Sequence, residues 1–222
     1  MTAVDPGSPD RAPPPAAGEP GAGHQVPDSL PPRERLIAAA LDLFGTIGYD
    51  ATTVQALCQR ARISSRDFYL HVADRLELVG ILLEREVGEI RAPLSQAFAH
   101  APPVIDARAR LWATHWVGRM VQDPRRFRVV YTEAIGVSAD LDRRRQRALH
   151  ASVELMTQEL ARCAEARGVR RLPDHYRFVA DALLATTREV MARHLDGDLP
   201  PTTPERIVDD LVRMAVILGE QW

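Results

Sequence analysis

Residues 45–75, GTIGYDATTVQALCQRARISSRDFYLHVADR, contain three helix-start signals in close succession. Each signal begins with a polar side chain that can accept hydrogen bonds from the free amides of a first helical turn. Apolar residues at helical spacing follow it. In two of them an acidic residue follows three positions later, which makes a near capping box. The middle helix, Ser65–His71, has room for only one or two turns, so it must pack on its neighbours to be stable. The signals are Thr53, Ser64 with Asp67, and Asp74 with Glu77.

An apolar stripe ahead of this stretch predicts a preceding helix that begins near Arg33 and ends before Gly48, where a left-handed residue is favoured. Three closely spaced helices with a tight turn before the last one form an arrangement that presents a helix to the DNA major groove. The sequence therefore predicts a small DNA-binding head. The stripe consists of Leu36, Ile37, Ala40, Leu41 and Phe44.

The spacing of many residues in this region resembles the TetR family of bacterial transcriptional regulators. The resemblance covers about residues 33 to 80. It implies that the N-terminal helices bind DNA, and that a larger helical domain dimerises and binds a small ligand that releases the operator. The residues that carry it are Phe44, Gly48, Tyr49, Thr53, Leu57, Ala61, Ile63, Ser64, Phe68, Tyr69, His71 and Arg75.

The resemblance also implies which residues contact DNA. Arg66 is the candidate for reading a guanine, because its planar guanidinium can pair with O6 and N7. Phosphate contacts are expected from Tyr69, His71 and Arg75, and from two threonines at the amino end of the second helix. The alternatives are that Tyr69 packs inside the head and that Arg66 is merely solvated. The full predicted set is Thr52, Thr53, Ser65, Arg66, Tyr69, Leu70, His71 and Arg75.

Two positions depart from the family pattern. Arg62 stands in the turn where the family usually has glycine, so it must either adopt a strained positive φ or shift the turn. Asp67 stands where a hydroxyl residue is common, and a carboxylate there repels DNA phosphates unless it is occupied in capping.

Charge and composition limit the class of protein. The formal net charge of the chain is −2, and all 28 basic residues are arginine. Residues 33–75 hold six arginines and five acids, a mild bias that differs from the basic stripe of a non-specific DNA binder. Residues 1–32 hold nine of the 17 prolines and almost nothing large and apolar, which predicts a disordered tail.

The pattern of the remaining residues predicts helices separated by proline and glycine. No alternation of apolar and polar residues predicts a strand there. Breaks are predicted at Pro93 and at Pro102–Pro103. The predicted fold is all-α, with a disordered tail (1–32), a three-helix DNA-binding domain with a helix-turn-helix (33–77) and a larger helical ligand-binding and dimerisation domain (78–222). Helices are expected at Val104–Val121, Arg125 to about Ala134, Ala139–Ala166, Pro173 to about Leu195, and from Pro204 onward.

An effector pocket is implied by the family and is only weakly specified by the residues. Aromatic and methionine side chains recur every four positions in the fifth and sixth helices, although such stripes are usually plain core. The candidates for ligand binding are Trp112, His115, Trp116, Met120, Phe127, Tyr131, Glu133 and Met156. The arginines at 143–145 and Arg147 could attract an anionic effector, but a solvated helix face is the simpler interpretation.

The last two helices have wide apolar faces, which in the family meet a second copy as a four-helix bundle. The alternative is packing within one chain. The predicted dimerisation residues are Phe178, Ala182, Leu183, Thr186, Val190, Ile207, Leu211, Met214 and Leu218.

Cys58 and Cys163 both occupy apolar helical positions, which indicates a reduced cytoplasmic protein, with redox sensing as the alternative. The sequence shows no metal-ligand spacing, no cofactor motif, no nucleophile with a base and no apolar run of membrane-spanning length. The leading hypothesis is a homodimeric regulator, most often a repressor, that binds a palindromic operator and is released by a small apolar or amphipathic effector. The alternatives are a ligand-independent DNA-binding module and an all-helical enzyme.

Overall fold

The computed structural model describes residues 26–169 and 172–220, and within these ranges it contains helices and no strand. The predicted disorder of residues 1–32 therefore lies mostly outside the described residues. Three helices form the head: α1 (Pro32–Thr46), α2 (Val54–Ala61) and α3 (Ser65–His71). The prediction of the short middle helix is confirmed residue for residue.

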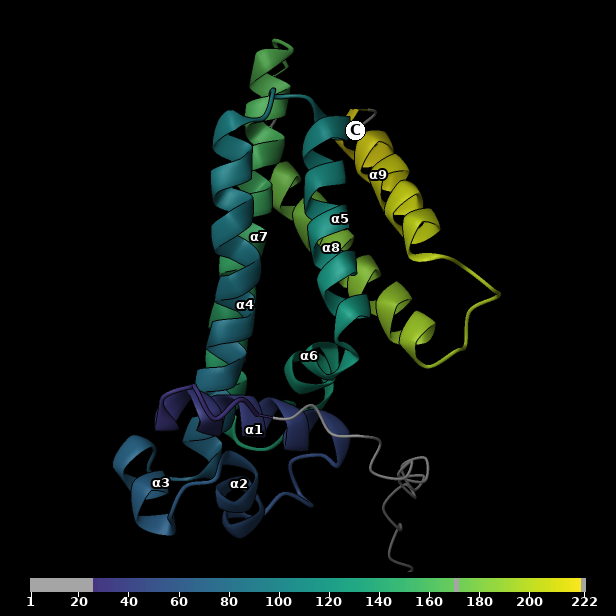
Figure 1. Cartoon of the computed structure of the whole chain (residues 1–222). Coiled ribbons are helices and arrows are strands. Elements are labelled where there is room, and N and C mark those ends of the chain that lie inside the picture. The colour runs from purple at the N-terminus through teal and green to yellow at the C-terminus, as the bar shows by residue number, and fades with distance from the viewer. Residues whose placement is uncertain (1–25, 170–171, 221–222) are drawn as a thin grey trace, which may run out of the picture.

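The body consists of long helices that run away from the head (Figure 1). α4 packs along α7, and α9 packs on α5. The C-terminal end of α9 lies at the end of the molecule opposite α1 to α3 (Figure 1). The elements are α4 (Arg75–His100), α5 (Ile105–Gln122), α6 (Pro124–Arg128), the π-helical turn η1 (Val129–Glu133), α7 (Ala139–Ala166), α8 (Pro173–Leu195) and α9 (Pro204–Glu220).

Two expectations about the body are corrected. Pro93 does not break the chain, because α4 continues through it to His100. Buried Ile90, Leu94 and Phe98 lie on both sides of the proline, so tertiary packing outweighs the lost backbone hydrogen bond. The sixth helix is not one element either, since it changes after Arg128 into the π-helical turn η1.

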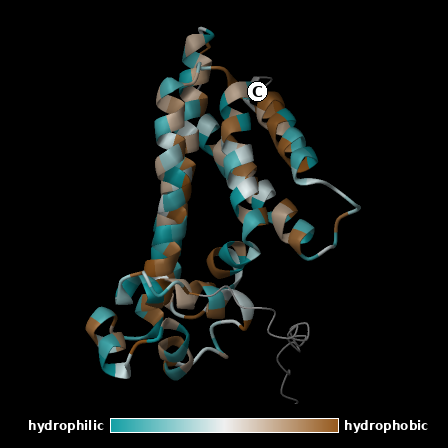
Figure 2. Ribbon diagram, in the orientation of Figure 1, coloured by the Kyte–Doolittle hydropathy of each residue, from teal (hydrophilic) through white to brown (hydrophobic). Residues whose placement is uncertain are grey.

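The buried side chains form two clusters, one in the body and one centred on the head. The head cluster contains Phe44, Leu57 and Phe68, and it extends into the body through Val129 and Leu141. Along the long helices hydrophobic and hydrophilic residues are interleaved, as each helix buries one face (Figure 2). The head therefore does not have a hydrophobic core of its own, because part of that core comes from η1 and α7. Among the described helices, none is long and apolar enough to cross a bilayer.

The approach of α6 to α1 requires a glycine. A Cβ atom on Gly45 would lie 2.4 Å from Cβ and 2.9 Å from Cα of Arg125. Beside this contact, the Arg125 guanidinium donates a 2.8 Å hydrogen bond to the Asp42 carboxylate. Close backbone packing and an ion pair thus hold the body against the head at the same place.

We expect Gly45→Ala to lower the free energy of unfolding by about 1–3 kcal/mol, because the added methyl group must push α1 and α6 apart. Urea unfolding measures this change. Gly88→Ala is the matched control, since no atom lies within 4 Å of the Cβ it would add in the middle of α4. That variant should be as stable as the original or up to about 1 kcal/mol more stable. Equal stability of the two variants would contradict the tight α1–α6 contact.

Candidate DNA-binding and effector-binding sites

The second and third helices are fixed by the predicted caps. The Thr53 hydroxyl accepts a 3.1 Å hydrogen bond from the amide of Ala56 at the start of α2. At the start of α3, the amide of Asp67 donates to Ser64 Oγ at 3.0 Å, and the amide of Ser64 donates to the Asp67 carboxylate at 3.2 Å. Phe68 is fully buried and anchors α3 to the head. These contacts set which side of α3 faces outward.

The outward side of α3 carries most of the predicted DNA-binding residues. Ser65 and Arg66 are exposed, and Tyr69 and Leu70 are 60% and 71% exposed. His71 at the end of the helix is half-buried. The alternative in which Tyr69 packs inside the head does not fit this exposure. These exposed side chains therefore remain predicted DNA contacts, and an exposed leucine such as Leu70 suits the methyl group of a thymine.

Two predicted phosphate contacts are contradicted by their placement. Thr52 is fully buried, and its hydroxyl donates a 2.7 Å hydrogen bond to the carbonyl of Gly48. The Arg75 guanidinium turns inward, where it lies over the Tyr49 ring and donates to the carbonyls of Tyr49 and Thr52. Both side chains brace the loop between α1 and α2, so neither is directed at DNA. Thr53 stays at the exposed amino end of α2, where a phosphate is electrostatically favoured.

The two departures from the family pattern are explained by the local geometry. Arg62 has φ and ψ of 52°, so the turn keeps its left-handed residue and accepts the strain of a side chain there. The Asp67 carboxylate is engaged in the capping box with Ser64. Hydrogen bonds from the side chain and backbone of Ser64 hold the pKa of Asp67 below its ordinary value. Its charge therefore stabilises the start of α3, which accounts for a carboxylate at this position.

Several arginines of the head are engaged in holding it together. Arg60 pairs with Asp42 at 2.5 Å, and Arg62 pairs with Asp28. Arg35 donates to the carbonyl of Ala61 at 2.9 Å. The positive charge offered to DNA is thus smaller than the arginine count indicates, and Arg66 is the cation that projects from α3.

A cavity of about 190 Å³ lies in the body between α4, α5, η1, α7 and α8. Four of the predicted ligand-binding residues line it: Trp112, Trp116, Tyr131 and Met156. The Tyr131 ring packs against those of Phe127 and Trp116, with centroids 4.9 and 6.1 Å away. The wall is therefore aromatic on the side of α5 and η1.

The other four candidates do not line this cavity. Met120 and Phe127 are packed in the core of the body, and His115 is half-buried on α5. Glu133 lies at the junction with the head, where it accepts a 2.8 Å hydrogen bond from the amide of Tyr49. The spacing of these side chains along a helix does not show whether they pack in the core or line a cavity.

The sequence interpretation missed the polar part of the cavity wall, which comes from the paired helices α7 and α8. The sequence of α8 contained a signal for this polar wall. Asp181 and Arg188 are seven positions apart, so they place a polar side chain at every second turn of an otherwise apolar helix face. The missed polar residues are Ser152, Asp181, Thr187 and Arg188.

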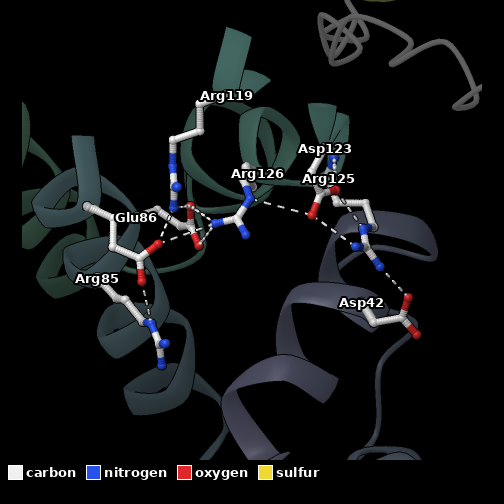
Figure 3. Close-up of polar contacts among 8 residues, drawn as sticks. Asp42, Arg85, Glu86, Arg119, Asp123, Arg125 and Arg126 are labelled. Atoms are coloured by element: carbon white, nitrogen blue, oxygen red, sulfur yellow. Dashed lines mark hydrogen bonds and ion pairs between the residues drawn. The ribbon is translucent and has the colours of Figure 1, made fainter. Parts of the chain in front are cut away.

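The junction between head and body is made of charged side chains (Figure 3). Nearly buried Glu86 on α4 pairs with Arg119 of α5 at 2.9 Å and with Arg126 of α6 at 2.6 Å. The contacts continue through Asp123 and Arg125 to Asp42 of α1. Burial alone would raise the pKa of Asp123, but the hydrogen bonds and charge of Arg125 lower it below its ordinary value. This network ties three body helices to α1.

The predicted dimerisation residues divide into two groups. Leu183, Ile207 and Leu211 are at most 3% exposed in the single chain, because α8 and α9 pack into the body, so they offer no surface to a second copy. Phe178 is 71% exposed on α8 and is the largest apolar side chain available there. The remaining residues are exposed or half-buried: Ala182, Thr186, Val190, Met214 and Leu218.

Both cysteines are buried free thiols, and burial raises the pKa of Cys163 above its ordinary value, which favours the unreactive thiol. Within residues 26–169 and 172–220, no group of three or more His, Cys, Asp and Glu side chains is placed to hold a metal ion.

Residues 36–80 match the family model described as bacterial regulatory proteins of the tetR family. This match confirms the resemblance read from the sequence, so these residues form a DNA-binding domain of the TetR type. No curated protein matches the chain significantly in sequence.

Solved structures share the fold of most of the chain, head and body included. The fatty acid degradation regulator FadR from Bacillus halodurans is 14% identical, with a TM-score of 0.73 over 87% of this chain and 97% of that one. FadR from Bacillus subtilis, solved in complex with stearoyl-CoA, is 12% identical, with a TM-score of 0.71 over 85% and 98%. A TetR-like regulator from Rhodococcus sp. RHA1 is 20% identical, with a TM-score of 0.67 over 85% and 97%. At these identities the likeness shows the fold of head and body together.

The left-handed turn predicts the effect of substituting Arg62. Arg62→Gly removes backbone strain of about 1–2 kcal/mol. Glycine also makes the unfolded chain more flexible, which offsets part of this gain, so the variant should be as stable as the original protein or slightly more stable. Arg62→Val should be less stable by about 1–2 kcal/mol, because a β-branched residue tolerates positive φ poorly. Thermal unfolding compares them. If Val is tolerated as well as Gly, the turn is not left-handed in solution.

Proposed function

We propose that this protein is a transcriptional repressor that binds a palindromic operator as a homodimer and leaves it when a small apolar or amphipathic effector enters the body. The exposed face of α3 would read the DNA, with Arg66 on a guanine and neighbouring side chains on bases and phosphates. The cavity behind Trp112 and Trp116 would hold the effector.

One observation supports the link between these two sites. The turn η1 carries Tyr131, which lines the cavity, and two residues later Glu133, which accepts the amide of Tyr49 in the head. Arg128, just before η1, donates to Glu133 at 2.9 Å and to the carbonyl of Thr46 at 2.7 Å. A ligand that moves Tyr131 therefore acts on a segment that is hydrogen-bonded to the head at both ends.

The geometry favours a ligand-responsive regulator over a ligand-independent DNA-binding module. Tyr131 packs against both buried clusters, that of the body and that of the head. An effector can shift an equilibrium only by its difference in affinity for the two states, and a wall shared by both cores can provide that difference. The stearoyl-CoA of the Bacillus subtilis regulator supports an amphipathic effector.

We expect Arg66→Ala to bind the protein's own upstream DNA at least about 30-fold more weakly, because the variant dimer loses one guanine contact of about 1–3 kcal/mol in each of its two half-sites. Binding to unrelated DNA should weaken much less. Gel shift with both DNAs measures this. Arg91→Ala is the matched control, because it removes the same charge from an exposed position of α4 far from the head. Undiminished operator binding by Arg66→Ala would refute the assignment, and failure of the original protein to retard its upstream DNA would argue against the proposed function.

We expect the protein to sediment as a dimer at micromolar concentration and Phe178→Glu to shift it to monomer, because a buried unpaired carboxylate opposes association. Ile135→Glu places the same charge on another exposed apolar residue, in the loop after η1, and should leave the dimer intact. Analytical ultracentrifugation distinguishes the species. A monomeric original protein, or a dimer unaffected by Phe178→Glu, would exclude α8 as the interface.

A further inference from the structure

The cavity has one end that is rich in positive charge and lacks a negative partner. Arg188 lines it from α8. Arg145 lies on α7 one turn before Leu149, a lining residue, so the two share a helix face. The Nε atom of Arg145 is buried without a hydrogen-bond partner. Among the residues that the structure describes, no carboxylate pairs with either arginine.

Neighbouring arginines differ in this respect. Arg143 pairs with Asp140 at 3.2 Å, and Arg144 pairs with Glu84 at 2.9 Å. A buried, unsatisfied guanidinium nitrogen costs free energy, which a bound acceptor would recover. The one carboxylate in the cavity wall, Asp181, is two helical turns from Arg188 and lies 3.9 Å from Arg177, so it does not neutralise this end.

Tyr131 lines the same cavity as Arg188. Burial raises the pKa of Tyr131 above its ordinary value, while a hydrogen bond from Trp116 and the positive charges of Arg188 and Arg145 oppose the rise. Tyr131 and Arg188 both line the cavity, and so does Leu149, which shares a helix face with Arg145. At this pKa the phenol stays protonated and can donate a hydrogen bond to an anion.

The volume of the cavity limits the apolar part of the ligand. A protein cavity of about 150 Å³ can hold benzene, so a volume of 190 Å³ holds an apolar group of about seven or eight carbon atoms. Tryptophan and tyrosine rings on the wall suit an aromatic ring or a short alkyl chain. A stearoyl chain would not fit unless the cavity widened.

We propose that the effector is a compact amphipathic anion, an aromatic or short-chain acyl group whose acidic head is held by Arg145, Arg188 and the Tyr131 hydroxyl. This inference rests on the proposed function, in which the cavity is the effector site. The head can be a free carboxylate or the phosphate-bearing carrier of an acyl thioester, because guanidinium groups bind both.

Isothermal titration of the full-length protein without DNA tests the proposal. The probes are octanoate and 3-phenylpropanoate, their neutral matches octan-1-ol and 3-phenylpropan-1-ol, and octanoyl-CoA. At least one anion should bind, and its neutral match should bind about 10- to 100-fold more weakly, the loss of a charge-assisted hydrogen-bonded pair. Binding of octanoyl-CoA alone would identify the carrier as the source of the anion, and binding of octanoate would identify the free acid.

Arg188→Gln and Arg145→Gln should each weaken binding of the anion by a similar factor. The weak binding of the alcohols should not change. Arg147→Gln is the matched control, because it removes the same charge from an exposed position of α7 that lines an open groove instead of this cavity. Thermal melting verifies that each variant is folded. Equal binding of acids and alcohols, no effect of Arg188→Gln, or no binding of any anion at millimolar concentration would overturn the proposal. None of these outcomes depends on DNA, so loss of operator binding remains a separate result.

Discussion

The architecture depends on one carboxylate, that of Asp42. It is nearly buried on α1 and receives Arg60 of α2 on one oxygen and Arg125 of α6 on the other. Removing one partner of such a group leaves a buried charge unpaired, which is more costly than the pair is favourable. The DNA-reading head and the body are thus anchored to the same side chain, and neither arginine can be withdrawn without disturbing the other.

The π-helical turn η1 makes a second contact between body and head, through Glu133 and the amide of Tyr49. A π-helical turn places residues differently from an α-helix, and such turns are frequent at functional sites. Here Tyr131 faces the cavity, and Glu133, only two residues later, reaches the head. The turn therefore contacts both the cavity and the head over a very short length of chain.

Much of the head could be predicted because its signals are local. Thr53, Ser64 and Asp67 act within one turn of their own position, so capping chemistry alone sets the starts of α2 and α3. Thr52 and Arg75 could not be assigned correctly in this way, because their partners Gly48 and Tyr49 come from a loop whose path depends on tertiary packing. In the body, the same limit explains why Glu133 was placed in the pocket and Arg188 was overlooked. A carboxylate and a guanidinium are assigned by what they meet across helices, and spacing along one helix does not contain that information.

The unbroken course of α4 from Arg75 past the cavity has a mechanical consequence. Val87, Ile90 and Leu94 of this helix line the cavity, and its first residue, Arg75, follows α3 closely. From Ile90 to Arg75 the rod measures about 22 Å. A tilt of about 5° at the cavity would carry the head through about 2 Å, by leverage alone. In the proposed symmetric dimer the two displacements would add, and the spacing of the two α3 helices would then no longer match the fixed pitch of the double helix.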